Sequence, residues 1–457
     1  MVYRVPHLIN MKLIARHILQ RRGYLIDLFE RSPTLVREIV EFVETILQSW
    51  AMRKSDSFTM LDWESVKVAK LKKLFENATT VSRWHRIFFN KVRNADINSL
   101  ADIARLPIST RRYLKNNPIR DQISQIRIPY AIKTSTSGST AEPLAFYYDG
   151  RMIPLTKMDI LNEFIYFGSK SMPRCFVIGL GTHLWLDSIG FRVSSIQLEQ
   201  RSERKRILYP FLETQNPRAL ITTTSLMLRF AKLLKDDGFA FGFDYMKYVG
   251  EPMSAINRNA LELQFGAKIF TTYASREVPL IGIQCSKRFF HITPWVSHIE
   301  ILDESGKPVN DNAEGRIVIT YFENYVMPFI RYDIGDRGII HSEPCPCGRK
   351  TKTITFTGRA GGSIETPSGK SVMLLAISSA IAKNFHDTIA RFQLEQTAPE
   401  KLIFRFVPSA RYTPAADKQL IQTLSSLLYN EIACELDRVP VILPNAEGKT
   451  PIFIKSF

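Results

Sequence analysis

Between residues 127 and 272, short β-type runs alternate with amphipathic helical segments along the chain. Alternation of strands and helices is typical of an α/β domain with a mostly parallel sheet. The chain has enough apolar side chains for such a core, because 45% of its 457 residues are hydrophobic. The expected strands are Arg127–Lys133, Leu144–Tyr148, Cys175–Gly179, Ala219–Thr222 and Lys268–Thr272, and the expected helices include Ser225–Lys235 and Ala255–Leu263.

The segments on either side of this region have different periodicities. Residues 1–125 are predicted to be helical and include an amphipathic run from Trp63, whereas strands dominate beyond His291. We therefore expect a helical N-terminal region at 1–125 that is part of a large domain, an α/β core with a β-rich subdomain at 126–357, and a small α+β domain at 358–457. The later elements are predicted as strands Ile299–Leu302, Gly315–Tyr321, Gly338–Ile340 and Lys401–Val407, and a long helix Ala415–Leu436.

Positive charge is concentrated in the first third of the chain. The formal net charge is +17, and residues 1–133 contribute 24 Lys+Arg against 12 Asp+Glu. Such a region favours nucleic acid, an anionic membrane surface or a polyanionic cofactor as a partner, or is simply a solvated helical surface. No helix-turn-helix, zinc-finger or RNA-recognition signature accompanies the charge, so we do not expect nucleic-acid binding.

The sequence gives no sign of secretion or of a membrane span. The longest apolar runs, such as Cys175–Gly181, are far shorter than the roughly 20 residues that a spanning helix needs. Arg16 and His17 interrupt the apolar run near the start, and five cysteines are too few for a disulfide scaffold. We expect a cytoplasmic protein, with peripheral membrane contact and homodimer formation left open.

A hydroxyl-rich segment, Lys133–Thr140, lies between two predicted strands. It contains six Ser or Thr residues and one glycine, and Pro143 follows it. Hydroxyls and free backbone N–H groups in a flexible turn can converge on the oxygens of a polyphosphate. The segment lacks the Gly-Lys-Ser/Thr ending of a Walker loop, and taken alone it also fits an ordinary turn.

Further motifs follow in a fixed order. Gly250-Glu251-Pro252-Met253-Ser254 comes first, then Tyr273-Ala274-Ser275-Arg276-Glu277, then Arg331-Tyr332-Asp333-Ile334-Gly335-Asp336, then Gly358-Arg359 and finally Gly448-Lys449. Together with the hydroxyl-rich segment, this series resembles the adenylate-forming (ANL) superfamily, most closely the phenylacetate–CoA ligase family and its capsule-biosynthesis (CapK-like) relatives. The resemblance runs from about Val66 to the C-terminus. It implies a large adenylate-forming domain followed by a small, mobile C-terminal lid.

The resemblance also implies a reaction. Such enzymes join a carboxylate to ATP, release pyrophosphate, and pass the acyl group of the resulting acyl-adenylate to a thiol, usually that of coenzyme A. Two anions must be brought together, so the site needs positive charge, a metal ion and aligned donors. The residues that the resemblance assigns to ATP or AMP are Ser135, Ser137, Gly138, Ser139, Thr140, Gly250, Glu251, Pro252, Tyr273, Ala274, Ser275, Asp336 and Arg359.

Individual roles follow from the same resemblance. Lys449 would complete the adenylation site, because a lysine can reach both the α-phosphate and the attacking carboxylate. Glu277 would hold Mg²⁺, and Asp336 would accept hydrogen bonds from the ribose. Arg331 and Arg359 would serve the ribose–phosphate region or the closing hinge, and Arg331 is grouped here with Lys449 and Glu277 as catalytic.

The chain departs from the family pattern at several positions. Glu142 stands where many members have lysine, and Ala274 and Arg276 replace the usual Gly and Ser around the tyrosine motif. The hinge continues with Gly361-Gly362 in place of an acidic pair. Two glycines suit a swivel, whereas the loss of the acidic pair leaves CoA as acceptor an open question.

Four further residues have the spacing of a metal site. Cys285 and His291 are six residues apart, and Cys345 and Cys347 are two apart. Three thiolates and one imidazole form a closed, structural zinc site, an arrangement that relatives of phenylacetate–CoA ligase also carry. The alternative to a metal site is a set of buried free thiols, and His341 and His298 are rival imidazole ligands. The other two cysteines are expected in the core: Cys175 in an apolar run and Cys434 on the last predicted helix.

The identity of the acid is the least readable feature. Phe164, Phe167, His183, Trp185 and Phe191 lie where the family's substrate-binding segment falls, so an apolar or aromatic acid would fit. For any single one of them, core packing is the favoured explanation. Three functions remain open: an acid–CoA ligase, an adenylating transferase of capsule or lipopolysaccharide pathways with an amine or hydroxyl acceptor, and a non-catalytic nucleotide-binding protein.

Overall fold

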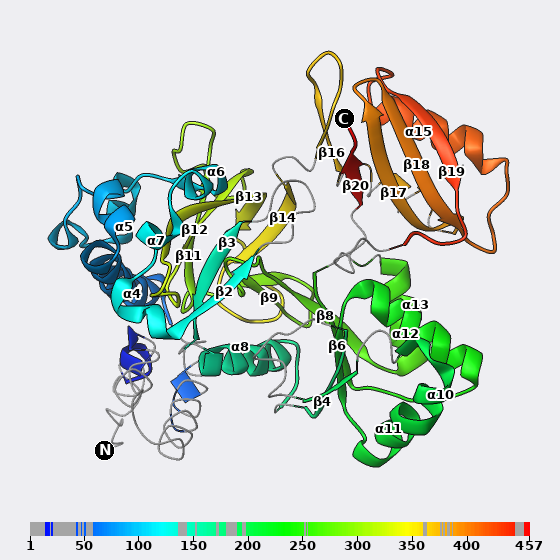
Figure 1. The fold of residues 1–457 in the computed structure, drawn as a ribbon, viewed down its shortest axis with the longest axis horizontal. Helices are drawn as coiled ribbons and strands as arrows, with labels where there is room; N and C mark the ends of the chain where they lie inside the picture. Colours follow the sequence, from blue (N-terminus) through cyan, green and yellow to red (C-terminus); the bar gives the residue numbers. More distant parts are fainter. Residues whose placement is uncertain are drawn as a thin grey trace, which may run out of the picture.

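The computed structural model describes residues 14–18, 20–21, 43, 47, 50–51, 58–135, 144–150, 153–170, 173–179, 190–193, 198–250, 253, 255–359, 363–374, 377, 380–381, 384–385, 387–443 and 452–457. Within these ranges, a 12-stranded mixed sheet forms the centre of a large lobe (residues up to 359), and a four-stranded sheet lies in a smaller C-terminal lobe (residues 363–457; Figure 1). No helix among the described residues is both long and apolar enough to cross a bilayer.

One half of the large sheet is parallel, with the strand order β8-β7-β6-β4-β5. Strands β4 and β6 are buried at every residue, as expected where helices cover both faces. Helix α12 is bounded by two specific signals: the Thr223 hydroxyl caps its start, and Gly238, at φ +68°, ends it in the left-handed region. The elements are β4 (Cys175–Ile178), β5 (Gly190–Val193), β6 (Ala219–Thr222), β7 (Tyr245–Tyr248), β8 (Lys268–Tyr273), α8 (Ile153–Tyr166), α10 (Arg201–Glu203), a π turn at Arg204–Leu208, α11 (Tyr209–Gln215), α12 (Thr224–Asp237) and α13 (Ala255–Phe265).

The other half of the sheet is mainly antiparallel, in the order β11-β12-β13-β14-β10-β9. It joins the parallel half where β9 pairs antiparallel with β8, so the sheet is continuous. Strand β14 pairs with both β13 and β10. The elements are β9 (Gly282–Gln284), β10 (Phe290–Ile292), β11 (Ser297–Leu302), β12 (Gly315–Tyr321), β13 (Phe329–His341) and β14 (Thr353–Arg359), with β1 (Ser109–Thr110) parallel to β13.

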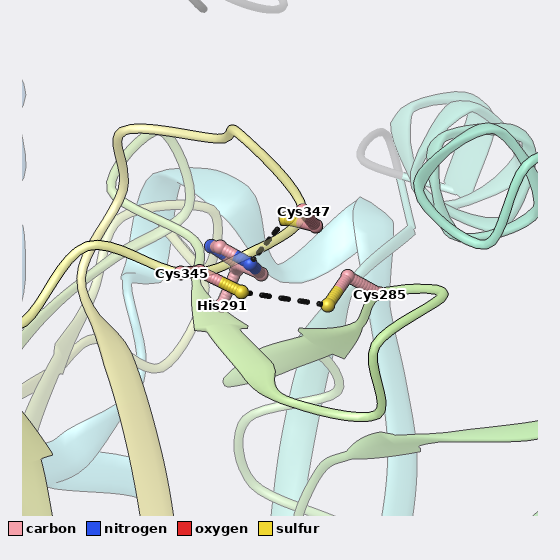
Figure 2. A group of neighbouring side chains, drawn as sticks. All are labelled: Cys285, His291, Cys345 and Cys347. Carbon is pink, nitrogen blue, oxygen red and sulfur yellow. Dashed lines mark hydrogen bonds between the residues drawn. The ribbon is translucent and has the colours of Figure 1, made fainter.

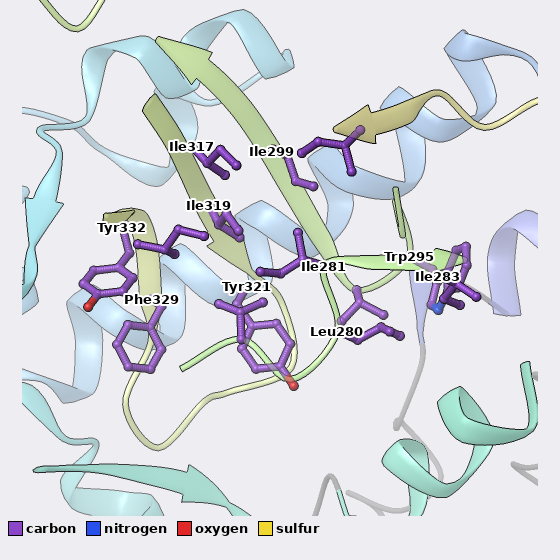
Figure 3. Packing of buried hydrophobic residues seen from close by; sticks show 14 of the residues in the cluster. Leu280, Ile281, Ile283, Trp295, Ile299, Ile317, Ile319, Tyr321, Phe329 and Tyr332 are labelled. Carbon is purple, nitrogen blue, oxygen red and sulfur yellow. The ribbon is translucent and has the colours of Figure 1, made fainter. Parts of the chain in front are cut away.

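A helical lead-in packs against the antiparallel half. Helix α4 (Met60–Val81) begins with a capping box in which the Asp62 carboxylate accepts the Thr59 N–H at 2.8 Å. The main core lies between this lead-in and the sheet, and Figure 3 shows Ile317, Ile319 and Tyr332 among its buried side chains. The remaining lead-in elements are α5 (Arg83–Phe88), α6 (Arg111–Lys115), α7 (Ile119–Gln122) and 3₁₀ turns at Asn94–Asp96, Leu100–Arg105 and Gln125–Tyr130.

Three smaller sheets complete the described fold, and one of them is the antiparallel pair β15–β16 of the C-terminal lobe. Strands β2 (Ala131–Ser135) and β3 (Ala145–Asp149) form an antiparallel hairpin. The C-terminal lobe has its own sheet, in the order β19-β18-β17-β20, and its own apolar core. Arg391 of this lobe donates a 3.1 Å hydrogen bond to the Ser225 hydroxyl at the start of α12. The elements of this lobe are β15 (Ser363–Glu365), β16 (Ser371–Met373), β17 (Ile389–Ala398), β18 (Lys401–Pro408), α15 (Ala416–Leu427), β19 (Ala433–Arg438) and β20 (Phe453–Lys455).

Two sequence predictions of local structure are wrong. The expected strand Arg127–Lys133 begins only at Ala131, because a 3₁₀ turn containing Pro129 precedes it. The expected helix Ala415–Leu436 ends at Leu427, where Tyr429 and Asn430 take positive φ values, and Cys434 consequently lies on strand β19. The proposed domain boundary at 357 stays a prediction, although it falls two residues before β14 ends.

Candidate functional site

The predicted nucleotide motifs emerge from one edge of the parallel sheet. Strands β7 and β8 are neighbours in parallel register, with Tyr248 opposite Thr271. Gly250 follows the end of β7 and Tyr273 is the last residue of β8, so both loops leave the carboxyl edge, where α/β sheets bind their ligands. Gly250 has φ +73°, a conformation that favours glycine. Glu251 and Pro252 lie outside the described residues.

Tyr273 and Asp336 meet although they are 63 residues apart in the chain. The Tyr273 hydroxyl donates to Asp336 Oδ2 at 2.9 Å, and the Asp336 side chain is buried. The Phe356 ring on β14 lies 5.6 Å from the Tyr273 ring, and 40% of Phe356 remains exposed. An aromatic pair therefore stands beside a carboxylate acceptor, a combination that suits a base and its ribose.

Glu277 is held on the loop that follows Tyr273. The Ser275 hydroxyl accepts the Val278 N–H at 3.0 Å, and this hydrogen bond closes the turn that contains Glu277. The Glu277 carboxylate is 3% exposed, accepts the Tyr332 hydroxyl at 3.1 Å and lies 3.9 Å from the Arg111 guanidinium. Tyr332 and Asp336 are four residues apart on β13, so this strand contacts Glu277 through Tyr332 and Tyr273 through Asp336.

Of the residues predicted to bind the β- and γ-phosphates, the structure describes only Ser135. Ser135 pairs with Ala145 at the loop end of the β2–β3 hairpin, and Ser137, Gly138, Ser139 and Thr140 lie outside the described residues. The Tyr148 hydroxyl of β3 donates to the Arg276 carbonyl, which ties the hairpin to the Glu277 loop. Burial raises the pKa of Tyr148, so its hydroxyl keeps the proton that it donates.

Arg331 does not join these residues. Its buried guanidinium donates to Glu300 at 2.8 and 3.0 Å and to the backbone carbonyls of Ala104 and Leu106. These contacts anchor the helical lead-in to the sheet, so we leave Arg331 out of the catalytic proposal. The Arg359 backbone pairs with Asp336, which places this residue beside the site, whereas Lys449 lies outside the described residues.

The aromatic residues expected in the acyl pocket divide into two groups. Phe164 and Phe167 of α8 are buried against Phe270 of β8, with ring centroids 5.1 and 4.7 Å apart, as core residues are. His183 and Trp185 lie outside the described residues, as does the side chain of Phe191. The structure therefore leaves the acid unassigned.

The four predicted metal ligands converge. Cys285 follows β9, His291 is on β10, and Cys345 and Cys347 lie between β13 and β14; their ligand atoms are all within 4.8 Å of one another (Figure 2). The Cys285 and Cys345 sulfurs are 3.8 Å apart, and His291 Nε2 is 3.2 Å from the Cys347 sulfur. The three cysteines are free of disulfides.

The surroundings of His291 prepare it to bind a metal. Its Nδ1 lies 3.0 Å from the Thr351 carbonyl and 2.9 Å from the Thr351 hydroxyl, so a proton on Nδ1 would have an acceptor and would leave the Nε2 lone pair facing the thiols. Tyr166, at the end of α8, packs its ring against His291, and the Arg349 guanidinium lies 3.7 Å from the Tyr166 ring. The rival His341 instead bonds Thr355 at 2.7 Å.

Comparisons with known proteins bear on this arrangement. No family profile matches the chain. It is 24% identical over 298 residues to a phenylacetate-coenzyme A ligase of Aromatoleum evansii and 22% identical over 268 residues to one of Thermus thermophilus, which covers 62% and 55% of this chain. The chain spans 66% and 59% of those relatives, less than two thirds of each. Among solved structures, a 2-hydroxyisobutyryl-CoA ligase in the postadenylation state superposes with a TM-score of 0.73, covering 88% of this chain and 91% of the other at 16% identity.

In sequence the chain is similar to phenylacetate-coenzyme A ligases, and its fold is that of the solved 2-hydroxyisobutyryl-CoA ligase. The predicted α/β fold class is confirmed, including the continuation of the parallel sheet into a β-rich part. Two residues of the candidate site could not be found from the sequence. Around Phe356 the sequence shows only the alternating pattern of a strand, which predicts no contact with Tyr273. Arg111 lies 166 positions before Glu277, which it faces, and no motif surrounds it.

Proposed function

We propose that this chain is an AMP-forming ligase that activates an organic acid, of apolar or aromatic character, and transfers the acyl group to coenzyme A. In the first step a carboxylate oxygen attacks the α-phosphorus of ATP, the bond to the β-phosphate breaks, and pyrophosphate leaves. In the second step the thiol of CoA loses its proton and attacks the acyl carbon, and AMP leaves. The first step replaces one phosphorus–oxygen bond by another, and the second replaces a carbon–oxygen bond by a carbon–sulfur bond. Neither step involves oxidation or reduction.

The hydrogen bond between Tyr273 and Asp336 is the observation that carries this proposal. It joins two motifs that the chain separates, at the carboxyl edge of the sheet and beside Glu277. In the proposed complex the Tyr273 and Phe356 rings flank the adenine, and Asp336 accepts the ribose hydroxyls. The Gly250 loop and Ala274 would border the base, as the sequence motifs predict.

The remaining roles concern negative charge. Ser135 and the hydroxyls of 137–140 would donate to the β- and γ-phosphates, and Lys449 would neutralise the α-phosphate as the carboxylate approaches. Glu277 fits a Mg²⁺ ligand, because its buried carboxylate lies on the nucleotide loop; bound Mg²⁺ would supply charge neutralisation at the phosphates. The segment 358–457, which contains the C-terminal lobe, is proposed as the lid that carries Lys449.

We also propose that Cys285, His291, Cys345 and Cys347 bind one structural zinc ion. Two sulfurs bound at about 2.3 Å to a tetrahedral zinc are about 3.8 Å apart. The Cys285–Cys345 separation of 3.8 Å agrees with that spacing. With four protein ligands no position stays open for substrate, so the metal stabilises the fold and takes no part in the reaction.

The test is pyrophosphate release from ATP with a panel of carboxylic acids, with hydroxylamine added to trap the acyl-adenylate. Lys449→Ala is expected to abolish adenylate formation while ATP still binds, whereas Lys418→Ala, an exposed lysine of the same lobe, should behave as wild type. Wild-type turnover in Lys449→Ala would remove this residue from the mechanism. ATP binding without pyrophosphate release from any acid would identify a nucleotide-binding protein.

A second measurement identifies the acceptor. With CoA present, the proposal expects an acyl thioester and stoichiometric AMP, both measured by mass spectrometry. The Gly361-Gly362 hinge, which replaces an acidic pair, favours the amine or hydroxyl transferase as the second candidate. Adenylate formation without thioester, followed by acyl transfer to an amine or a sugar hydroxyl, would establish that alternative.

A further inference from the structure

A cavity opens on the lead-in between α5 and the α6–α7 segment. Its volume is about 180 Å³, and Arg83, Trp84, Ile87, Phe88, Tyr113 and Asp121 contribute to its lining. Trp84 and Phe88 stack with ring centroids 4.6 Å apart, and Tyr113 lies 4.8 Å from Phe88. We call the surface around this cavity, residues 83–88 and 111–121, the lead-in face.

The lead-in face exposes apolar side chains. Helix α5 turns Trp84 and His85 into the core, and its opposite side presents Arg83, Arg86 and Ile87 to solvent. Ile87 is 62% exposed, and Tyr113 is 43% exposed. A large aliphatic side chain and an aromatic one beside an aromatic-lined hollow form a surface that gains free energy when it leaves water.

The same face carries unbalanced positive charge. Residues 83–88 and 111–121 contain six Lys+Arg and one acidic residue, Asp121. Of the six, Arg111 lies 3.9 Å from the Glu277 carboxylate. Within the described ranges, exposed Arg83, Arg112 and Arg120 have no carboxylate at ion-pair distance. The single carboxylate of the cavity, Asp121, is outnumbered by these three guanidiniums.

We infer that the lead-in face docks on the surface of an anionic lipid bilayer. Arginines attract acidic headgroups, and exposed aliphatic and aromatic side chains enter the boundary between headgroups and acyl chains. A nucleic acid would neutralise the positive charge but would place the exposed Ile87 against charged phosphates. The combination of positive charge and exposed apolar side chains therefore favours a lipid surface over a nucleic acid. The docking is peripheral, and it does not depend on the proposed ligase activity.

Vesicle sedimentation of the full chain tests this inference. Phosphatidylcholine vesicles are compared with vesicles that also contain phosphatidylglycerol, at low and high salt. Binding is expected only with the anionic lipid and should weaken as salt rises. Each arginine at an anionic surface strengthens partitioning about fivefold, so Arg83→Gln with Arg112→Gln should lower it about 25-fold. Ile87→Ser should weaken binding and leave its salt dependence unchanged.

A matched control removes the same charge elsewhere. Lys268 and Lys418 are exposed lysines outside the lead-in, and replacing both by Gln should leave vesicle binding unchanged. Circular dichroism of every variant shows that its fold is retained. Equal binding to neutral vesicles, or equal loss in the control variant, would overturn the inference. Absence of vesicle binding together with a concentration-dependent dimer that Ile87→Ser dissociates would also overturn it, because a second copy would then occupy the face.

Discussion

Replacing Cys345 by Ser removes one of four ligands from the proposed zinc ion, and the structure sets the size of the effect. The metal would link Cys285 to Cys345, which are 60 residues apart. For a cross-link that closes a loop of this length, the entropy removed from the unfolded chain corresponds to about 4 kcal/mol. The large lobe unfolds with an entropy of about 2.1 cal/mol/K per residue, so the loss should lower its Tm by about 5 °C.

The assay pairs zinc content with calorimetry. Wild type is expected to carry one zinc per chain and to lose about 5 °C in Tm when a strong chelator removes it. Cys345→Ser should be zinc-free and melt at that lower temperature whether or not chelator is present. Cys434→Ser makes the same chemical change outside the metal cluster, on β19, and should keep the zinc. Full zinc content in Cys345→Ser would refute the ligand assignment, and an unchanged Tm in a zinc-free wild type would refute the cross-link argument.

Three further predictions concern pH, packing and the nucleotide. Burial lowers the pKa of His85 to about 4, so the stability that its neutral form contributes is present above about pH 6.5 and is lost as pH falls toward 4. Wild type should therefore lose about 2 kcal/mol more between pH 7 and 5 than His85→Gln does, measured by urea unfolding; equal losses would contradict this. Gly338→Ala should cost about 1–3 kcal/mol in the same assay, because its Cβ would lie 2.7 Å from the Thr355 carbonyl, whereas Gly282→Ala, with no neighbour closer than 3.4 Å, serves as the tolerated control. Asp336→Asn should weaken ATP binding about 10- to 100-fold in calorimetric titration, since a charge-assisted hydrogen bond is worth about 1.5–3 kcal/mol; unchanged affinity would exclude Asp336 from the ribose site.

Local patterns were sufficient to predict much of the fold. Ala219–Thr222 and Gly315–Tyr321 are strands with the expected bounds, because each is a short apolar run rich in branched side chains. The end of the last helix at Leu427 has a sequence signal in Asn430, because asparagine is among the residues that tolerate a left-handed backbone at a helix end. Pro129 likewise argued against a strand from Arg127.

The site was harder to predict, because its geometry depends on contacts between distant segments. The four residues of the proposed metal site could be grouped from their spacing, since zinc restricts residue type and number. Arg331 could not be placed, because its partner Glu300 has no motif and the two meet only when β11 and β13 pack beside the lead-in. A motif shows that an arginine is present, whereas burial and partners decide whether it binds a ligand or holds the fold.

Strand β14 connects the Cys285–His291–Cys345–Cys347 cluster with the Tyr273–Asp336 pair of the proposed nucleotide site. Near its start, Thr353 is in register with His291, and at its end Arg359 is in register with Asp336. A displacement of this strand by a bound nucleotide would therefore be transmitted to the imidazole of the metal cluster. Cobalt substituted for zinc changes its visible absorption when its ligands move, so the metal cluster would serve as a built-in optical reporter of nucleotide occupancy, with no attached dye.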